Sequence, residues 1–409
     1  MNKLTTLSID KFRNVAPTTL EFRPGLNVVL GRNGTGKSTL LRLLSATLGA
    51  EEGLRDDALE VRCRIAGTAL EVEHTLSCSR VEQPSVSMVS GEFVSETLSV
   101  LQRADTFFIE KKGQPTRRFR VLPNDIFLDG EEPQSRVDRV FPGDPIWSLG
   151  LALMMARPDA ESKALAQEIL ATRIVGAYRL DEGTERLQRL MELEFELVRA
   201  GYRVKSPRGP EEFPQSFFTI LRGPVPEGTS ETSPLAFLDR AAAILGYESA
   251  AARFDVERLG PAPGQQVVRL NNLRFFFKKP GEEVSHDLLG HGQKRLLSFL
   301  AYADASRDII IADDLVAGLH PEWIPACLQE VGERQAFLTS QNPLLLDALR
   351  FDSVEDVRRA FILCERASGD SGTQLLWRNP THAQASAFFA AYEKRMQRVS
   401  DILLTQGFW

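Results

Sequence analysis

Gly31-Arg-Asn-Gly-Thr-Gly-Lys-Ser38 is the stretch of this sequence that decides its fold. It follows the apolar run Leu26–Leu30, and residues 37–48 carry leucines at helical spacing. A strand that enters a glycine-rich loop, which then opens a helix, is the context that a phosphate-binding loop requires. The sequence therefore predicts that these residues bind ATP together with magnesium.

The residue types of this loop match the chemistry of phosphate binding. Glycines allow backbone N–H groups to turn toward the phosphates, and the first turn of the helix adds positive potential. We expect Lys37 to reach the β- and γ-phosphates and the hydroxyl of Ser38 to bind magnesium. The other residues predicted to contact the nucleotide here are Asn33, Gly34, Thr35, Gly36 and Thr39. A chance glycine-rich turn is the alternative, and the complete pattern in its proper context argues against it.

An acidic strand end is the second candidate element, at Asp308-Ile-Ile-Ile-Ala-Asp-Asp314. An apolar strand of this kind presents its final carboxylates at the edge of a sheet, where ligands bind. We expect Asp313 to hold magnesium through a water molecule and Asp314 to polarise the water that attacks ATP. Acidic residues commonly end strands, so this interpretation depends on the phosphate-binding loop earlier in the chain.

Five segments together resemble one class of ATPases. In chain order they are Ile9-Asp-Lys-Phe-Arg-Asn14, Gly34-Thr-Gly-Lys-Ser-Thr39, Leu289-Gly-His-Gly-Gln-Lys294, the acidic strand end and Gly318-Leu-His-Pro321. This order resembles the ABC-class ATPases, and within them the RecF/SMC-like soluble group with its overcoming-lysogenisation-defect relatives. The resemblance covers roughly residues 1–50 and 285–350 and leaves the middle of the chain uninformative.

The resemblance implies a head that works in pairs. In this class two heads sandwich two ATP molecules, and the signature segment of one head contacts the γ-phosphate held by the other. Residues 289–293 align with the signature Leu-Ser-Gly-Gly-Gln: Gly292 and Gln293 match, whereas Gly290 and His291 replace Ser and Gly. Either His291 supplies the donor that the serine would have given, or it is an exposed polar residue at a helix start.

The resemblance also bears on the base and on catalysis. Phe12 and Arg13 would lie near the nucleotide base. Many relatives place Glu where Asp314 stands and His where Gln341 stands. Asp is one methylene shorter than Glu, and Gln carries no proton or charge at neutral pH. Because this catalysis depends on positioning and electrostatics, we expect slow ATP hydrolysis, with ATP binding used as a switch.

Length and composition are those of a globular protein with more than one part. The chain has 409 residues, 43% of them hydrophobic, which is long for a single core. It contains no run of about 18 apolar residues that could span a membrane, and its N-terminus lacks the apolar block of a signal peptide. The four cysteines include no Cys-x-x-Cys pair, which fits a reducing compartment. We therefore expect a cytoplasmic protein without a membrane partner.

Charge leaves the choice of partner open. The net charge is −6, and basic clusters such as that between Lys111 and Arg120 are more often solvated faces than binding patches. DNA stays a candidate partner. The resemblance implies a second copy of the chain as another, in a dimer or a higher oligomer. A separate effector protein is the third, because residues after 350 hold no clustered acidic nuclease motif.

A few other residues are weaker candidates. Gln102 or Gln114 could be the magnesium-contacting glutamine that the resembled class carries, or an ordinary surface residue. The five histidines show no metal-ligand spacing, and we expect them on the surface or in turns. Residues 275–277, three phenylalanines, are expected in a core strand, and residues 385–404 are expected to pack back on the head.

The order of elements predicts an α/β fold, a P-loop NTPase of the ABC-ATPase head type assembled from both ends of the chain. We divide it into an N-terminal ATPase lobe (1–150), a mainly helical insertion (151–260) and a C-terminal ATPase lobe (261–409). Helical spacing over 159–200 and 233–252 supports the insertion. Residues 265–278 have the pattern of a strand.

Three functions follow from these predictions. The leading one is a soluble ABC-type ATPase that dimerises or oligomerises on ATP–magnesium and drives or gates a partner in DNA maintenance or anti-phage defence. The second is a non-hydrolysing ATP sensor or scaffold, motivated by Asp314 and Gln341. The third is the nucleotide-binding subunit of a transporter, against which the Phe-Arg opening and the long segment before the signature both argue.

Overall fold

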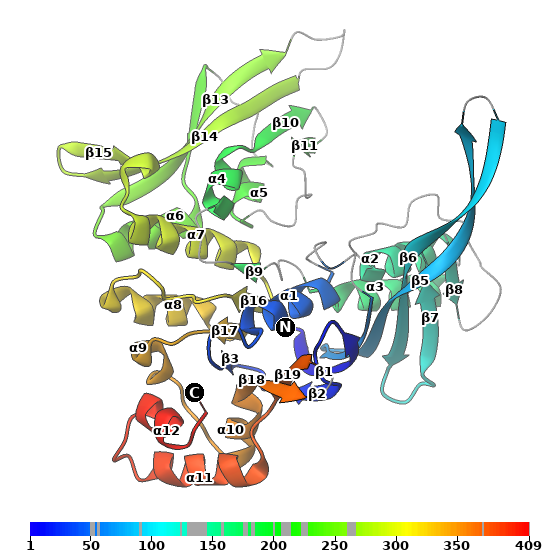
Figure 1. Ribbon diagram of the computed structural model, residues 1–409. Helices are drawn as coiled ribbons and strands as arrows, with labels where there is room; N and C mark the ends of the chain where they lie inside the picture. The colour runs from blue at the N-terminus through cyan, green and yellow to red at the C-terminus, as the bar shows by residue number, and fades with distance from the viewer. Residues whose placement is uncertain are drawn as a thin grey trace. The chain divides into compact units, whose positions relative to one another are not determined.

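The computed structural model groups the chain into two compact units, residues 1–177 with 351–409 and residues 178–350 (Figure 1). The residues that the structure describes are 1–49, 54, 58–89, 92–122, 125–128, 145–156, 159–174, 179–180, 185–198, 201–205, 214–221, 228–259, 267–369 and 372–408. This grouping differs from the predicted three-part division, which stays a prediction. In the described part of the chain, no helix has the length and apolar character needed to cross a membrane.

The first unit joins both ends of the chain in a parallel pair of strands. Strand β3 (Leu26–Leu30) runs parallel to β18 (Phe361–Gly369), which forms an antiparallel hairpin with β19 (Gly372–Arg378). After β3 the chain turns through the glycine-rich loop into α1 (Lys37–Thr47). Apart from its first residue β3 is buried, as are the leucines on α1. The predicted strand–loop–helix and the assembly from both ends are confirmed.

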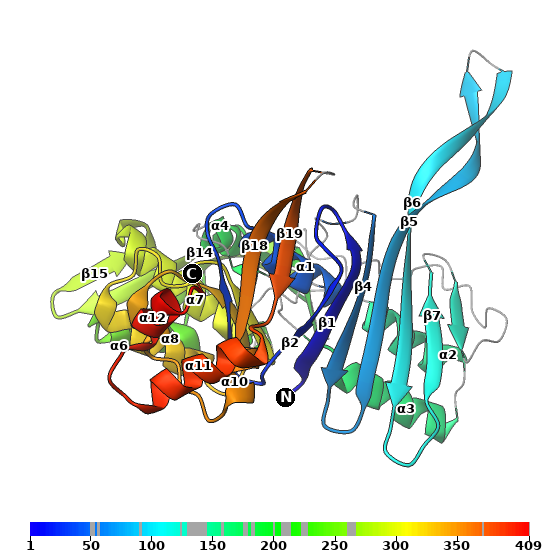
Figure 2. The same cartoon turned by 60° about the horizontal axis from the view of Figure 1, so that its bottom comes forward.

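A seven-stranded antiparallel sheet makes up much of the rest of the first unit, in the order β2-β1-β4-β5-β6-β7-β8. Its strands are β1 (Lys3–Phe12), β2 (Thr18–Glu21), β4 (Leu59–Ala66), β5 (Glu71–Val89), β6 (Glu92–Glu110), β7 (Arg117–Val121) and β8 (Ile126–Leu128). The predicted hairpin of β4 and β5 is confirmed, with Leu59 opposite Cys78. Strands β5 and β6 are much longer than expected and extend as a ribbon past their neighbours (Figure 2).

Helices complete the first unit. Near the sheet lie α2 (Pro145–Ala156) and α3 (Ala160–Ala171), and Lys111 Nζ donates to both carboxylate oxygens of Glu168 on α3 at 2.7 and 2.8 Å. The C-terminal helices are α10 (Val354–Ala360), α11 (His382–Glu393) and α12 (Val399–Thr405). Phe388 of α11 packs edge-on against Phe361 of β18 at 5.4 Å between ring centroids. The C-terminal segment therefore packs back on its own unit, as predicted.

Three parallel strands lie in the second unit. Strand β16 (Ile309–Ala312) is fully buried and runs parallel to β17 (Gln335–Thr339) on one side and to β9 (Arg179–Leu180) on the other. Strand β16 has the predicted bounds. The helices of this part are α7 (His291–Ala305), α8 (Ile324–Val331) and α9 (Pro343–Leu346), with short 3-10 turns η2 (His286–Leu288) and η3 (Pro321–Trp323).

An antiparallel sheet occupies the rest of the second unit, in the order β11-β10-β14-β13-β12, with β15 paired to β14. Its strands are β10 (Glu194–Val198), β11 (Gly201–Lys205), β12 (Ser230–Ser233), β13 (Ser249–Leu259), β14 (Val267–Lys279) and β15 (Glu282–Ser285). Helices α4 (Glu185–Met191), α5 (Phe217–Leu221) and α6 (Ala236–Leu245) belong to the same region. Phe275 and Phe277 are buried in β14, as predicted for a core strand.

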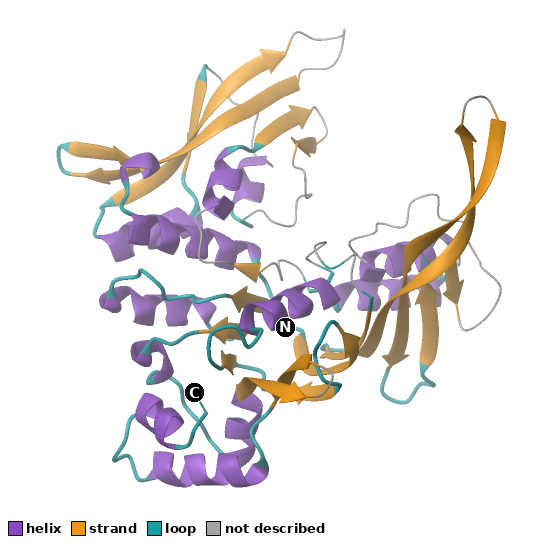
Figure 3. Ribbon diagram, viewed as in Figure 1, coloured by secondary structure: helices purple, strands orange, loops and turns teal. Residues whose placement is uncertain are grey.

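The middle of the chain is therefore less helical than the sequence suggested (Figure 3). Helix was expected through residue 200, but residues 194–198 form a strand in which Phe195 is buried between two partly exposed glutamates. That two-residue alternation outweighs the helix-favouring composition. The helix expected over 233–252 ends at Gly246, whose φ of 73° is left-handed, and β13 follows.

Candidate nucleotide-binding site

Two glycines fix the shape of the loop at residues 31–38. Gly31 has φ 146°, and a Cβ there would lie 2.3 Å from the carbonyl oxygen of Cys364. Gly36 has φ 88°, and its Cβ would lie 2.9 Å from Leu375 and 3.1 Å from Trp377. A side chain at either position meets both backbone strain and a neighbour on the β18–β19 hairpin. The loop therefore packs closely against β18 and β19, which come from the C-terminal part of the chain.

Side-chain hydrogen bonds hold this loop in place. The ammonium of Lys37 donates to the carbonyl oxygens of Gly31 at 2.8 Å and Arg32 at 3.1 Å. Thr35 Oγ1 donates to the carbonyl of Arg32 at 2.8 Å, and the indole of Trp377 donates to the carbonyl of Thr35 at 3.1 Å. With these carbonyl oxygens engaged, the loop presents its backbone N–H groups as an anion site at the start of α1.

The predicted contact residues of the loop differ in accessibility. Asn33, Gly34 and Ser38 are exposed, whereas Thr39 is half-buried and Thr35 is buried under the loop. A cation that sequence reasoning missed lies beside them: Arg366 Nη1 would be 3.4 Å from a Cβ on Gly34. The glycine cradle, the lysine and the serine hydroxyl together fit a nucleotide triphosphate with its magnesium ion.

The two residues predicted to lie near the base differ in accessibility. The ring of Phe12 is fully buried, with its centroid 6.4 Å from that of Trp377. Arg13 is exposed at φ 47° and places its guanidinium 5.2 Å from the centre of the Phe12 ring. Side-chain contact with a base is therefore open to Arg13 and closed to Phe12. Gln102 lies in β6 and Gln114 in the turn that follows it.

The acidic strand end lies in the second unit. Thr339 Oγ1 donates to Asp313 Oδ1 at 2.6 Å and accepts the backbone N–H of Asp314 at 2.7 Å. Asp314 has φ 47°, a left-handed conformation that Asp tolerates better than most residues. Arg295 Nη2 donates to the carbonyl oxygen of Asp314 at 2.5 Å. Both backbone polar groups of Asp314 are thus held, which fixes the backbone that carries its carboxylate.

Asp313 is the better candidate for a metal contact. Its side chain is 11% exposed, and its second oxygen, Oδ2, accepts from Arg179 Nη1 at 3.1 Å. Among the described residues there is no group of three or more His, Cys, Asp or Glu that could hold a metal. A carboxylate oxygen is the kind of ligand that magnesium prefers, and magnesium needs few protein ligands because it keeps several waters.

The signature segment opens α7 in the second unit. The backbone N–H of Gly290 donates to Gln293 Oε1 at 2.9 Å, which caps the helix. A Cβ on Gly292 would lie 2.5 Å from the carbonyl oxygen of Gly318, so the signature packs closely on the segment 318–321. His291 is exposed at the first position of the helix. Gln341 is also exposed, in the loop between β17 and α9.

Three further residues contact the acidic strand end, and no sequence motif identifies them. Thr339, Arg295 and Arg179 contact Asp313 or Asp314, yet they lie 25, 19 and 134 residues away along the chain from their partners. Arg179 comes from a two-residue strand that no periodicity could reveal. The contacts of Arg179 and Thr339 follow from the parallel register of β9, β16 and β17, and that of Arg295 from the position of α7; none of these can be read from local sequence patterns.

A buried charged cluster in the first unit was also missed. His74 was expected on the surface, but its ring is buried, with Nε2 2.8 Å from Asp105 Oδ1. The ring stacks on Phe107 at 4.5 Å, and Arg103 donates to both oxygens of Asp105 at 2.8 and 3.0 Å. Side chains alternate between the two faces of β5, and His74 points to the buried face. The Asp105 carboxylate provides the hydrogen-bond partner that the buried ring needs.

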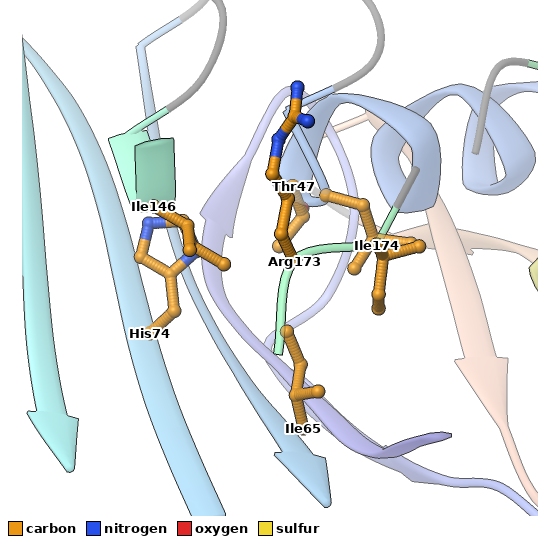
Figure 4. Close-up of a pocket in the computed structure, with 7 residues that line it drawn as sticks. Thr47, Ile65, His74, Ile146, Arg173 and Ile174 are labelled. Atoms are coloured by element: carbon orange, nitrogen blue, oxygen red, sulfur yellow. The ribbon is translucent and has the colours of Figure 1, made fainter. Parts of the chain in front are cut away.

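This histidine lines a small cavity of about 10 Å³ together with Ile146 and Arg173 (Figure 4). A space of this size holds about one water molecule. Thr47, at the end of α1, lines the same cavity. It is too small for a nucleotide or any substrate, so the cluster belongs to the packing of the sheet.

Asp105 gives the protein a predictable acid sensitivity. Burial alone would raise the pKa of Asp105, but Arg103 and the hydrogen bond to His74 outweigh it and lower the pKa below 3.8. A lowered carboxyl pKa contributes stability above the unfolded value that is lost as pH falls through the folded one. Urea unfolding against pH should therefore show stability falling below about pH 4. Asp105→Asn should lose about 1–3 kcal/mol at pH 7 and show a shallower fall; an equally steep fall would contradict this.

Known proteins provide an independent comparison. Residues 6–114 match the family model described as an AAA domain. No curated protein matches the chain. Among solved structures the chain is similar to an SMC head bound to the C-winged-helix domain of ScpA, at 10% identity and a TM-score of 0.40, over 92% of this chain and 98% of that one.

Two other solved structures are similar at the same low level. The recombination mediator RecF with ATPrS, of the RecFOR pathway, has 12% identity and a TM-score of 0.31, over 93% of this chain and 98% of that one. The SMC head domain with a coiled coil and joint from Pyrococcus yayanosii has 9% identity and a TM-score of 0.37, over 96% and 100%.

The family match and the loop geometry are separate observations that agree. The matched residues include most of β1, the glycine-rich loop and α1. The loop shows the positive-φ glycines and the lysine contacts that phosphate binding needs. Residues 6–114 are therefore similar to an AAA domain, and the glycine-rich loop within them has the geometry of a phosphate-binding loop.

Proposed function

We propose that this protein binds ATP with magnesium at residues 31–38 and associates with a second copy of itself around two nucleotides, so that ATP binding gates a separate partner. The observation that carries the proposal is the glycine cradle with Lys37 held on its carbonyl oxygens. Lys37 and the loop N–H groups would bind the phosphates, and Ser38 would bind the metal. Asp313 would hold a metal-bound water, and Asp314 would polarise the attacking water.

The signature segment supports the association of two copies. His291 is exposed at the start of α7, where the helix N-terminus favours an anion. In the class that the motifs resemble, this segment contacts the γ-phosphate of the other head. The close packing of Gly292 on Gly318 would then carry the contact to residues 318–321, which couple the heads in that class.

Slow hydrolysis is part of the proposal. Gln341 is exposed and offers a hydrogen bond without a charge or a proton to transfer. We expect a turnover below about 10 per second in the absence of a partner. The motif resemblance favours DNA maintenance or anti-phage defence as the setting, with DNA or a separate effector protein as the partner.

Oligomeric mass and ATP turnover, measured together, test this function. Light scattering with and without ATP–magnesium should show a larger mass in the wild type and no change in Lys37→Ala. Lys163→Ala, an exposed lysine on α3 of the same unit, is the matched control and should behave as the wild type. His291→Ala should bind ATP at the loop and give a smaller mass shift. If the wild type binds no ATP, or Lys37→Ala binds it equally well, the proposal fails.

A non-hydrolysing sensor is the second candidate function. It is favoured by Gln341 and by the short carboxylate of Asp314, which together offer less to an attacking water than the Glu and His of many relatives. The same experiment separates the two, because a sensor changes mass with ATP and releases no phosphate beyond the rate of uncatalysed hydrolysis.

A further inference from the structure

Strand β18 continues past the end of its parallel neighbour β3. The last residues paired between the two strands are Leu30 and Leu363, whereas β18 runs on to residue 369. The glycine-rich loop begins where β3 ends, so the free part of β18 lies beside the loop. A Cβ on Gly34 would accordingly lie 3.4 Å from Nη1 of Arg366. The strand thus places a guanidinium against the middle of the loop.

The alternation of side chains along β18 explains why Arg366 faces the loop. Cys364 lies two residues earlier and therefore on the same face of the strand. Its Cβ would be 3.1 Å from a Cβ on Gly31, at the start of the loop. Glu365 lies on the opposite face and accepts a hydrogen bond from Nη2 of Arg378 at 2.7 Å. The acidic neighbour of Arg366 is therefore turned away from the loop and already paired.

Arg366 is exposed, and its side chain forms no hydrogen bond or ion pair with any residue that the structure describes. Residues 31–38 carry Arg32 and Lys37 and no acidic side chain. Lys37 also lies near β18: burial raises the pKa of the Cys364 thiol to about 12, and the charge of Lys37 opposes that rise. Within the described part of the chain, neither Lys37 nor Arg366 pairs with a carboxylate, so the loop and its flank carry positive charge with no protein anion to balance it.

We propose that Arg366 is a further nucleotide-binding residue, whose guanidinium contacts the phosphate chain of ATP on the loop. The proposal rests on the function proposed above, in which residues 31–38 bind ATP, and adds a contact from the other end of the chain. A guanidinium presents several N–H donors in one plane, which match the oxygens of a phosphate. Arg366, Gly34 and Lys37 all belong to the first unit.

The proposal predicts a loss of ATP affinity that depends on charge. Arg366→Ala should raise the dissociation constant for ATP–magnesium by about tenfold at low salt, which corresponds to about 1.4 kcal/mol. The loss should shrink as salt rises, because exposed charges are screened within about 10 Å at 0.1 M ionic strength. Arg366→Lys keeps the charge without the planar donors, so its affinity should lie between those of the wild type and Arg366→Ala. The melting temperature should not change, because Arg366 is exposed and has no partner among the described residues.

Calorimetric titration of the full chain tests these expectations at ionic strengths of about 0.01 M and 0.15 M. The two probes are ATP with magnesium and inorganic tripolyphosphate with magnesium. Arg366→Ala should weaken both by a similar factor, because the contact is with phosphate. Arg359→Ala is the matched control, since Arg359 is an exposed arginine of the same unit that pairs with Glu355 at 2.7 Å on α10. Its affinities should equal those of the wild type at both ionic strengths.

The possible results separate this proposal from the function on which it rests. Unchanged ATP affinity in Arg366→Ala overturns the proposal, and so does a loss seen with ATP but not with tripolyphosphate, which would place Arg366 on the nucleoside. A wild type that binds neither probe would instead refute the proposed function. If Arg366→Ala melts at a lower temperature, Arg366→Lys and Arg366→Gln decide, because both keep a long side chain and differ in charge. Equal affinities in these two variants would overturn the proposal.

Discussion

Replacing Gly31 with alanine is expected to abolish ATP binding and to destabilise the first unit. The new Cβ would lie 2.3 Å from the backbone oxygen of Cys364 and 2.8 Å from Thr35 Oγ1, at a φ of 146°. Backbone strain of this kind costs about 1–3 kcal/mol, and overpacking adds about 1–3 kcal/mol. Relief requires β18 or the loop to move, and a moved loop no longer presents its N–H groups to phosphate. ATP affinity should fall more than a hundredfold.

Gly25 offers a matched control for this change. It precedes β3 in the same unit, and a Cβ there would meet no atom within 4 Å. Gly25→Ala should keep the melting temperature and ATP affinity of the wild type. Both variants would be measured by calorimetric unfolding and by titration with ATP–magnesium. A Gly31→Ala protein that binds ATP as the wild type does would show that ATP binding does not depend on the close packing of the loop against β18.

The close approach of Gly31 to Cys364 also shows what the sequence could and could not predict. The loop, β3 and α1 were predictable because pattern and spacing lie within one short segment. The strand that packs against the loop is β18, which begins at Phe361. The sequence predicted that both ends of the chain form one fold, but not that this strand contacts the loop. Burial raises the pKa of the Cys364 thiol to about 12, so this cysteine packs as an apolar group and carries no chemical motif to find.

The middle of the chain was harder to predict for a different reason. Residues 194–198 form a strand inside a segment predicted to be helical, and the strand 249–259 begins inside another, which was predicted over 233–252. Both strands pair with β14, which lies about 75 residues after β10 in the sequence and directly follows β13, and such pairing outweighs local propensity. The buried histidine at 74 was missed for a similar reason, since the carboxylate that satisfies it comes from the next strand.

At the acidic site the sequence indicated the two carboxylates but not what holds them. Asp313 and Asp314 end an apolar strand, and β16 has the bounds expected of it. Thr339 ties the two together through its single hydroxyl, from the end of the neighbouring strand β17. The left-handed φ of Asp314 gives a physical reason for Asp at this position, because Asp and Asn adopt that conformation more readily than Glu.

That conformation makes Asp314→Asn a clean test of catalysis. Asn keeps the size and the left-handed backbone, and the bonds from Thr339 and Arg295 reach backbone atoms that the change leaves intact. The amide cannot polarise a water as a carboxylate does, so ATP turnover should fall by about 10²–10³. ATP affinity should stay within a few-fold, and the ATP-dependent rise in mass should last longer.

Single-turnover hydrolysis, ATP titration and light scattering measure the three effects of Asp314→Asn in one set of conditions. Asp255→Asn, which alters a partly exposed carboxylate paired with Arg274 at 2.7 Å in the same unit, is the control and should leave all three unchanged. If Asp314→Asn hydrolyses ATP at the wild-type rate, water activation does not depend on this carboxylate. The role proposed for Asp314 would then be wrong, and another group would have to position the attacking water.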